Sequence, residues 1–416
     1  MKDRIILVEA YEILDSRGNP TLRTKVKLEN GIIGISSVPS GASTGKNEAL
    51  ELRDGDQSYY GGKGVLKAIE NVNQEIAPEI LGMTPDCQAE IDRMMIELDG
   101  TSNKSKLGAN AILGVSMANA VTAAKTHNLP LYAYLGGVGG FRLPMPMLNI
   151  INGGAHANNG LRIQEFMIRP DKAKSITEAL RMCFLVINNL KTIIKQRGES
   201  TSVGDEGGFA PMINENEDAL KLIVKAIKKS GFRNGIDVSI CLDVAANELF
   251  RNKKYSIHSK KFISPDKTIN KYLKLIKKYK IRSIEDPFAE DDWLSWNNFM
   301  KKINKNTQIV GDDLYVTNLE RLKVGFLNKS SNSILIKLNQ IGTVTETLEV
   351  IKFAHLIGYK TIISHRSGDS EDTFIADLAV GTDSNQIKTG SLARSERVSK
   401  YNQLIRIEEE LGKSSK

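Results

Sequence analysis

The sequence predicts an α/β protein in which a β/α barrel follows a smaller α+β domain. After about residue 140, eight short apolar runs alternate with segments of helical periodicity. Parallel strands joined by crossover helices produce this alternation, and eight strands within about 270 residues match a β/α barrel in number and size. Nearer the start, apolar strands come first and a block of helices follows, which is typical of an α+β domain.

The expected α+β domain begins with three strand-like segments. Residues 5–14 form an apolar run, residues 22–28 alternate between core-type and charged side chains, and residues 32–38 form a second apolar run. The turn at Asn30-Gly31 predicts that the second and third segments form a β-hairpin. From about Gly64 the apolar residues recur with helical spacing. The predicted helical stretches are VLKAIENVNQEIAPEIL, DCQAEIDRMMIEL and GANAILGVSMANAVTAAK.

A Gly/Pro-rich stretch at residues 135–146 marks the boundary between the two predicted domains, which span residues 1–138 and 139–416. The eight predicted barrel strands are MLNIIN, IQEFMI, IDVSICLD, IRSIEDP, TQIVGDD, SILIKLN, KTIISH and NQIKTG. Only about twelve residues of loop separate the first two, which leaves no room for a crossover helix. We therefore expect these two strands to form a hairpin.

Composition and charge exclude several classes of protein. The chain has 416 residues, of which 41% are hydrophobic and 25% charged, a balance typical of a soluble globular protein. Its three cysteines form no CxxC pair, so neither a disulfide framework nor a zinc site is predicted. The charged start of the chain lacks the apolar core of a signal peptide, which indicates a cytoplasmic protein.

The net charge of +8 does not by itself predict a nucleic-acid partner. In KLIVKAIKK and KYLKLIKKYK the lysines alternate with apolar residues at helical spacing, as on the solvated face of an amphipathic helix. The most apolar stretch, residues 108–124, contains Asn110, Ser116 and Asn119, and we interpret it as a buried helix and not as a membrane span.

Several predicted barrel strands end in a polar or charged residue that a buried strand has no structural reason to keep. These residues are Glu165, Asp243, Glu285, Asp312, Lys337, His365 and Lys388. From Asp243 onward they are 42, 27, 25, 28 and 23 residues apart, which is about one βα unit each. The carboxyl ends of barrel strands meet at one mouth, so we expect a single cavity that contains all of these groups.

Asp243, Glu285 and Asp312 are carboxylates without a neighbouring Cys or clustered His, and such hard oxygen ligands suit Mg²⁺. The alternative is that each of them caps a helix or forms an ion pair. Lys337 and Lys388 end two other strands in apolar surroundings. A neighbouring cation would favour the neutral form of Lys337, which could then abstract a proton.

The segment SHRSG, residues 364–368, places His365, Arg366 and Ser367 next to one another. An arginine fork with a hydroxyl and backbone N–H groups suits a phosphate, and the alternative for His365 is a structural role in the core.

Two glycine-rich loops remain. SGASTGKNE, residues 40–48, lacks the features of a nucleotide-binding loop, and we interpret it as a mobile lid. VGDEGGFAP, residues 203–211, places Glu206 between glycines, where it could approach a substrate and act as an acid; the alternative is an ordinary acidic turn.

Motifs along nearly the whole chain resemble one family, the enolases, which interconvert 2-phosphoglycerate and phosphoenolpyruvate. The matching motifs are DSRGNPT, VPSGASTG, EALELRDGD, LGANAILGVSMA, NGGAHA, IQEFMI, VGDEGGFAP, LDVAA, SIEDPFAEDDW, VGDDLYVTN, KLNQIGTVTE, SHRSGDSEDTFIADLAVG and IKTGSLARSERVSKYNQLIRIEEELG. The resemblance implies a barrel with ββαα(βα)6 order, activity as a hydro-lyase, and a homodimer or higher homo-oligomer.

The resemblance also assigns roles to individual residues. It implies two Mg²⁺ ions, of which the first is held by Asp243, Glu285 and Asp312, while Ser43 in the lid helps to bind the second together with substrate. The catalytic residues implied are Lys337 as the base at C2, Glu206 as the acid for the departing C3 hydroxyl, and Glu165 and His156 beside it. Six residues are implied to contact the substrate. They are His156, Gln164, His365, Arg366, Ser367 and Lys388.

The chain departs from the family pattern on an N-terminal strand, where Arg23 replaces an acidic residue, and this change bears on the subunit interface. Two other functions fit parts of the sequence. One is dehydration or racemisation of an acid sugar in the same barrel. The other is a binding role, in which Lys413 and Lys416 capture plasminogen at a cell surface or from a secreted pool, or the chain acts as a scaffold for RNA degradation.

Overall fold

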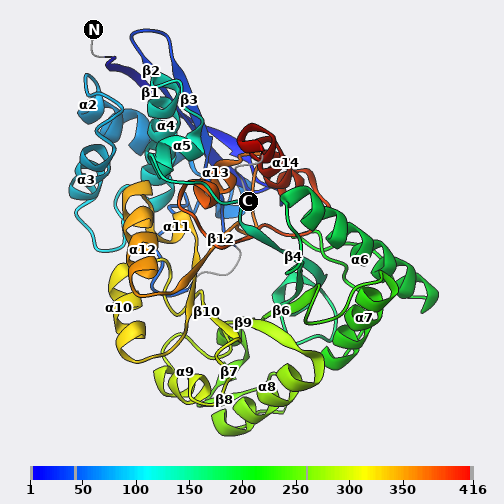
Figure 1. Ribbon diagram of the computed structural model, residues 1–416. Helices are drawn as coiled ribbons and strands as arrows, with labels where there is room; N and C mark the ends of the chain where they lie inside the picture. Colours follow the sequence, from blue (N-terminus) through cyan, green and yellow to red (C-terminus); the bar gives the residue numbers. More distant parts are fainter. Residues whose placement is uncertain (1–2, 42–44, 259–260, 413–416) are drawn as a thin grey trace.

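The structure, a computed structural model, describes residues 3–41, 45–258 and 261–412. The predicted metal ligand Ser43 lies outside the described residues. So do Lys413 and Lys416, and the binding role predicted from them stays a prediction. In Figure 1 an N-terminal group of strands and helices packs against one side of a closed barrel surrounded by helices.

Strands β1 (Ile5–Leu14), β2 (Pro20–Leu28) and β3 (Ile33–Ser37) form an antiparallel sheet in that order. This arrangement includes the hairpin predicted between the second and third strands. One face of the sheet packs on helix α4 (Ala109–Thr126). Gly34 permits the close approach, because a Cβ at this position would lie only 2.1 Å from Thr122 Oγ1.

The helices predicted after the N-terminal strands are confirmed. Besides α4 they are α1 (Leu66–Glu70), α2 (Ala77–Ile80) and α3 (Gln88–Asp99). The short helix α5 (Leu131–Gly136) was not predicted. The buried amide nitrogen of Asn119 in α4 is satisfied, since Nδ2 donates to the Pro85 carbonyl and to Gln88 Oε1, each at 2.9 Å. Within the described part of the chain, none of the helices has the length and apolar character needed to cross a membrane.

Eight strands close the barrel, and they match the eight predicted runs. They are β4 (Met145–Asn152), β5 (Glu165–Arg169), β6 (Ser239–Asp243), β9 (Ile281–Glu285), β10 (Gln308–Gly311), β11 (Ser333–Ile336), β12 (Lys360–Ser364) and β13 (Gln386–Lys388). Around the barrel they follow chain order, and β13 pairs with β4. β4 and β5 form the predicted hairpin, and β5 is antiparallel to β6 as well, so β5 is the one reversed strand of the barrel.

Two helices follow β5 and one main helix follows each later barrel strand, which confirms the ββαα(βα)6 order. These helices are α6 (Ile176–Gln196), α7 (Asn216–Lys229), α8 (Pro265–Tyr279), α9 (Trp293–Met300), α10 (Leu319–Leu327), α12 (Val344–Leu356), α13 (Phe374–Gly381) and α14 (Ser395–Leu411). The short helix α11 (Leu338–Ile341) and the small hairpin of β7 (Phe250–Arg251) and β8 (Lys254–Tyr255) are insertions. On α7 the apolar residues are buried and the lysines exposed, as predicted for a solvated basic face.

Side chains fill the barrel interior. A buried layer consists of Met147, Met167, Cys241, Val310, Leu335 and Ile362. At the opposite end from the carboxyl ends of the strands, Arg169 donates to Gln308 Oε1 at 3.3 Å and to Gln386 Oε1 at 3.0 Å. The interior is therefore a packed core, and the functional groups of the strands lie at the mouth.

Asp377 is a buried carboxyl group on α13, the helix that packs against α5 and α14. Its two oxygens accept hydrogen bonds from Gln403 Nε2 at 3.1 and 3.3 Å. Burial raises the pKa of Asp377 to about 7. An unfolded aspartate has a pKa near about 3.9, so the folded state binds an extra proton between these values and loses stability as pH rises through this window.

We expect Asp377→Asn to remove this dependence on pH. Between pH 5 and pH 8 the wild-type free energy of unfolding should fall by roughly 2–3 kcal/mol relative to that of the variant. Urea denaturation at the two pH values measures the difference. Asp383→Asn, at an exposed position just after the same helix, is the matched control and should follow the wild-type curve. A difference between wild type and Asp377→Asn that is the same at both pH values would contradict the prediction.

Candidate active site

The strand register brings the predicted acidic residues to one mouth of the barrel. Glu165 lies opposite Asp243 in the β5–β6 pair, and Asp243 lies opposite Glu285 in the β6–β9 pair. Asp243 and Glu285 end their strands, but Glu165 begins β5. The prediction that Glu165 ends a strand was wrong, and it reaches the same mouth because β5 runs in the opposite direction.

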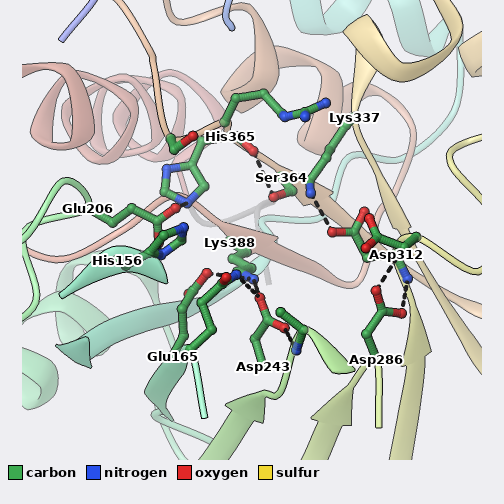
Figure 2. A pocket seen from close by; sticks show the side chains of 15 residues that line it. His156, Glu165, Glu206, Asp243, Asp286, Asp312, Lys337, Ser364, His365 and Lys388 are labelled. Carbon is green, nitrogen blue, oxygen red and sulfur yellow. Dashed lines mark hydrogen bonds and ion pairs between the residues drawn. The ribbon is translucent and has the colours of Figure 1, made fainter. Parts of the chain in front are cut away.

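A pocket opens at this mouth, and Figure 2 shows the side chains that point into it. Its lining consists of His156, Gln164, Glu165, Glu206, Asp243, Ala245, Asp286, Asp312, Asp313, Lys337, Ser364, His365, Arg366, Ser367 and Lys388. Two predicted site residues are not in this lining. Glu285 is buried next to the pocket and accepts a hydrogen bond from Lys388, and Ser43 lies outside the described residues.

Lys388 pairs with the three carboxylates that the strand register places side by side, those of Glu165, Asp243 and Glu285. Its Nζ lies 3.1 Å from Glu165 Oε1, 3.0 Å from Asp243 Oδ2 and 2.9 Å from Glu285 Oε1. Burial acts to lower the pKa of Lys388, but the carboxylates, led by Asp243, hold it well above its usual value. For Glu165 and Glu285 burial raises the pKa well above the usual range, and neighbouring carboxylates raise it further. One cation therefore does not neutralise the charge of three buried carboxylates.

Asp312 forms a second cluster with Lys337. The Lys337 ammonium donates to Asp312 Oδ2, and Gln340 Nε2 donates to Asp312 Oδ1 at 2.9 Å. Burial acts to lower the pKa of Lys337, but the Asp312 charge outweighs it and raises the pKa above its usual value. The neutral lysine expected from the sequence depends on a neighbouring cation, and it stays a prediction. The neutral form requires another cation to take up the charge of Asp312.

Glu206 lies between two histidines on the other side of the pocket. Its carboxylate oxygens are 3.6 Å from His156 Nδ1 and 3.6 Å from His365 Nε2, and Asn149 Nδ2 donates to it at 3.2 Å. Burial acts to raise the pKa of Glu206, but the nearby positive and imidazole groups, led by His156, hold it well below its usual range. Glu165 and Glu206 repel each other, which contributes to the raised pKa of Glu165, and the two carboxyl groups titrate as a coupled pair.

Arg366 projects from the loop that follows β12. Its guanidinium pairs with Glu48 at 3.0 Å and donates to Asn339 Oδ1 at 3.0 Å. Gly41 is close enough that a Cβ there would lie 1.9 Å from Arg366 Nη2, so a larger residue would displace the guanidinium. Arg17 Nη1 donates to Ser367 Oγ at 3.4 Å. The loop therefore presents a buried cation and a hydroxyl next to the pocket, and a carboxylate of the chain already binds the cation.

The donor set fits a hard divalent cation. Among the described residues, two groups place potential ligand atoms within 4.8 Å of one another: His156, Glu165 and Glu206, and Asp286, Asp312 and Asp313. One buried oxygen of each of Glu165 and Glu285, Oε2, makes no hydrogen bond in the described structure. Carboxylates with free oxygens suit Mg²⁺. The predicted trio of Asp243, Glu285 and Asp312 is not itself one of the two groups; Lys388 pairs with Asp243 and Glu285, and Lys337 pairs with Asp312.

Some residues of the site were not predicted. Asp286 accepts hydrogen bonds from the backbone N–H groups of Asp312 and Asp313, each at 2.8 Å, and thereby shapes the turn after β10. The paired acids in EDP and GDD were the available sequence signal. Glu48 was seen only as part of the predicted lid, and Asn149 had no signal. The helix-cap alternative for the carboxylates does not hold, since the side chains that cap described helices are those of Ser175, Asp292, Asn318 and Thr343.

Fold and site together define a class of protein: an enzyme with a β/α barrel whose mouth carries carboxylates, lysines and a buried arginine, in the position where barrel enzymes hold their active sites. Residues 140–416 match the family model described as the C-terminal TIM barrel domain of enolase, and residues 5–135 match the model of the enolase N-terminal domain. The chain is 66% identical over 413 residues to a protein of Pelagibacter ubique (strain HTCC1062) named enolase, which covers 99% of this chain and 98% of the relative. The chain belongs to the enolase family, whose members are lyases.

Proposed function

We propose that the chain catalyses the reversible dehydration of 2-phosphoglycerate to phosphoenolpyruvate and water in glycolysis and gluconeogenesis. One observation carries the proposal. Lys337 and Glu206 face each other across a single pocket, with Lys388 and its carboxylates between them (Figure 2). A base and an acid on opposite sides of a substrate are what removal of a proton and departure of a hydroxyl require.

In this mechanism Lys337 removes the proton at C2. A proton next to a carboxylate is weakly acidic, and its removal adds a second negative charge to that carboxylate. Lys388, whose pKa is raised, stays charged and would stabilise the developing charge electrostatically. Lys337 can act as a base once the charge of Asp312 is shared with another cation.

Asp243, Glu285 and Asp312 would hold the first Mg²⁺, and Ser43 would contribute to a second ion that binds with substrate. Bound Mg²⁺ supplies Lewis-acid stabilisation of negative charge on the substrate carboxylate. The free carboxylate oxygens and the raised pKa of Glu285 support the assignment, because both indicate a site with more acidic groups than its lysines neutralise.

Glu206 would protonate the departing C3 hydroxyl. The Glu165–Glu206 pair would hold the proton that this step needs, which the raised pKa of Glu165 supports, and His156 lies beside Glu206. Gln164, His365 and Lys388 would contact the substrate, while Arg366 and Ser367 would bind its phosphate. Arg366 already binds the carboxylate of Glu48, so a phosphate would replace one anion by another.

For the organisation of the chain, we propose an N-terminal domain of residues 1–138 with a lid at residues 40–48, and a catalytic barrel of residues 139–416. We also propose a homodimer or higher homo-oligomer, supported by the exposed apolar residues Ile6, Tyr11 and Leu14 on β1. Arg23, the residue that departs from the family pattern and bears on the subunit interface, pairs with Glu371 of its own chain. A cytoplasmic location follows from the glycolytic role.

The activity is tested by mixing the purified chain with 2-phosphoglycerate and Mg²⁺ and following the absorbance of phosphoenolpyruvate. We expect the signal to appear, to vanish with a chelator, and to be absent when the substrate is an acid sugar without phosphate. Independently of activity, Asp243→Asn should weaken Mg²⁺ binding by at least about 100-fold in calorimetric titration. A folded chain that forms no phosphoenolpyruvate with Mg²⁺ present would contradict the proposed function.

Lys337→Ala should abolish exchange of the C2 proton of 2-phosphoglycerate with D2O, and should lower turnover by about 10²–10⁴-fold or more, because the base is removed. Mass spectrometry measures the exchange, and calorimetry should show that Mg²⁺ still binds. Lys323→Ala, at an exposed position on α10, is the control and should exchange at the wild-type rate. Exchange retained by Lys337→Ala would overturn the assignment of the base.

A further inference from the structure

Arg397, on helix α14, is a fully buried arginine that the mechanism above does not use; its exposed fraction is 0%. Its Nη1 donates to His365 Nδ1 and, at 2.6 Å, to the Arg366 carbonyl. Its Nη2 donates to the carbonyl oxygens of Ser367 at 2.6 Å and Asp205 at 3.1 Å. Each Nη carries two hydrogens, so all four are used. One guanidinium thus joins the loop of residues 203–211, which holds Glu206, to the loop of residues 364–368.

The contact with His365 also fixes where the imidazole carries its proton. A guanidinium donates and cannot accept, so His365 Nδ1 must be the acceptor in this pair. In a neutral imidazole the proton then lies on Nε2. Nε2 is 3.6 Å from Glu206 Oε1, and Figure 2 shows the ring turned toward that carboxylate. Burial, and then the charge of Arg397, hold the pKa of His365 well below its usual value, which agrees with a neutral ring.

We propose that Arg397 is a positioning residue, which fixes His365 as the Nε2–H tautomer facing Glu206 and holds the acid-bearing loop against the loop that carries Arg366 and Ser367. The inference rests on the proposed function, in which Glu206 is the acid and Arg366 and Ser367 bind phosphate. Arg397 touches none of the reacting groups directly and acts through His365 and three backbone carbonyls.

A purely structural role does not account for a charge at this position. Well-packed apolar residues can replace buried ion pairs without loss of stability, so packing alone does not require an arginine here. Four acceptors from two loops converge on the guanidinium, and a lysine ammonium offers only three donors from a single point. The nearby carboxylates of Asp369 and Glu396, at 3.8 and 3.4 Å, offset the buried charge. The geometry therefore requires a planar, multidentate donor.

The first test uses the unmodified protein. The chain has five histidines, so selective ¹⁵N labelling gives five imidazole spin systems, and the signal lost in His365→Gln identifies His365. We expect wild-type His365 to be neutral, with the proton on Nε2, from pH 6 to pH 8. An Nδ1–H tautomer or an imidazolium in this range would overturn the proposal. Because this test reads a tautomer, it stays decisive even when the chain shows no activity, which would refute the proposed function separately.

The second test compares two variants of α14. Arg397→Lys should change the tautomer of His365 and lower kcat by about 10²-fold, because the acid is displaced relative to the phosphate. Tyr401→Phe is the matched control, since the buried Tyr401 hydroxyl donates only to the Gly390 carbonyl, at 2.7 Å, and its loss should leave the tautomer as in wild type. Circular dichroism establishes that both variants are folded. A folded Arg397→Lys variant with the wild-type His365 tautomer and the wild-type kcat would overturn the proposal. If this variant does not fold, the His365 tautomer measured in the wild-type protein decides whether the proposal stands.

Discussion

Buried carboxylates at the mouth of a closed barrel must be neutralised, and this requirement arranges the rest of the site. A carboxylate left unpaired in a protein interior costs several kcal/mol, which is a large part of the stability of a whole domain. The structure meets this cost in two ways. Lys388 and Lys337 each pair with acidic groups, and Glu165 and Glu285 have raised pKa values, which favours their neutral forms. The same excess of acidic groups is what makes the pocket suitable for a divalent cation.

The barrel supplies the precision that this balance needs. Its interior is filled by a packed layer, so the strand ends cannot move independently. Because β5 runs in the opposite direction, its first residue, Glu165, lies at the mouth of the barrel beside Asp243, the last residue of β6. The two sides of the pocket consequently differ in character. One side holds the lysines and the carboxylates that neutralise them, and the other holds Glu206 between two imidazoles.

The sequence predicts the barrel well because its strands are short apolar runs that end in charges, a pattern that a helix or a surface loop has no reason to produce. It predicts the β4–β5 hairpin because loop length limits topology. It does not predict how charges pair, since spacing along the chain identifies strand ends and not their neighbours across the mouth. The pairing of Lys337 is an example: its ammonium donates to the anion Asp312, and the spacing of the strand ends gave no sign of this contact. Arg397 was missed because it lies among charged residues of α14, and its burial becomes recognisable only when it is placed with Tyr401 and Leu404 on the buried face of that helix.

The contacts of Arg366 connect the site to the N-terminal part of the chain. Its carboxylate partner Glu48 follows Lys46, which pairs with Asp291 near α9, and Ser40 exchanges backbone hydrogen bonds with Gly368. An anion that binds Arg366 must compete with Glu48, so its affinity includes the cost of releasing that carboxylate. The competition favours ligands with more charge and more oxygen acceptors than a carboxylate, and a phosphate has both. The Arg366–Glu48 ion pair thus contributes to ligand specificity, because a weakly charged ligand gains too little binding free energy to displace Glu48.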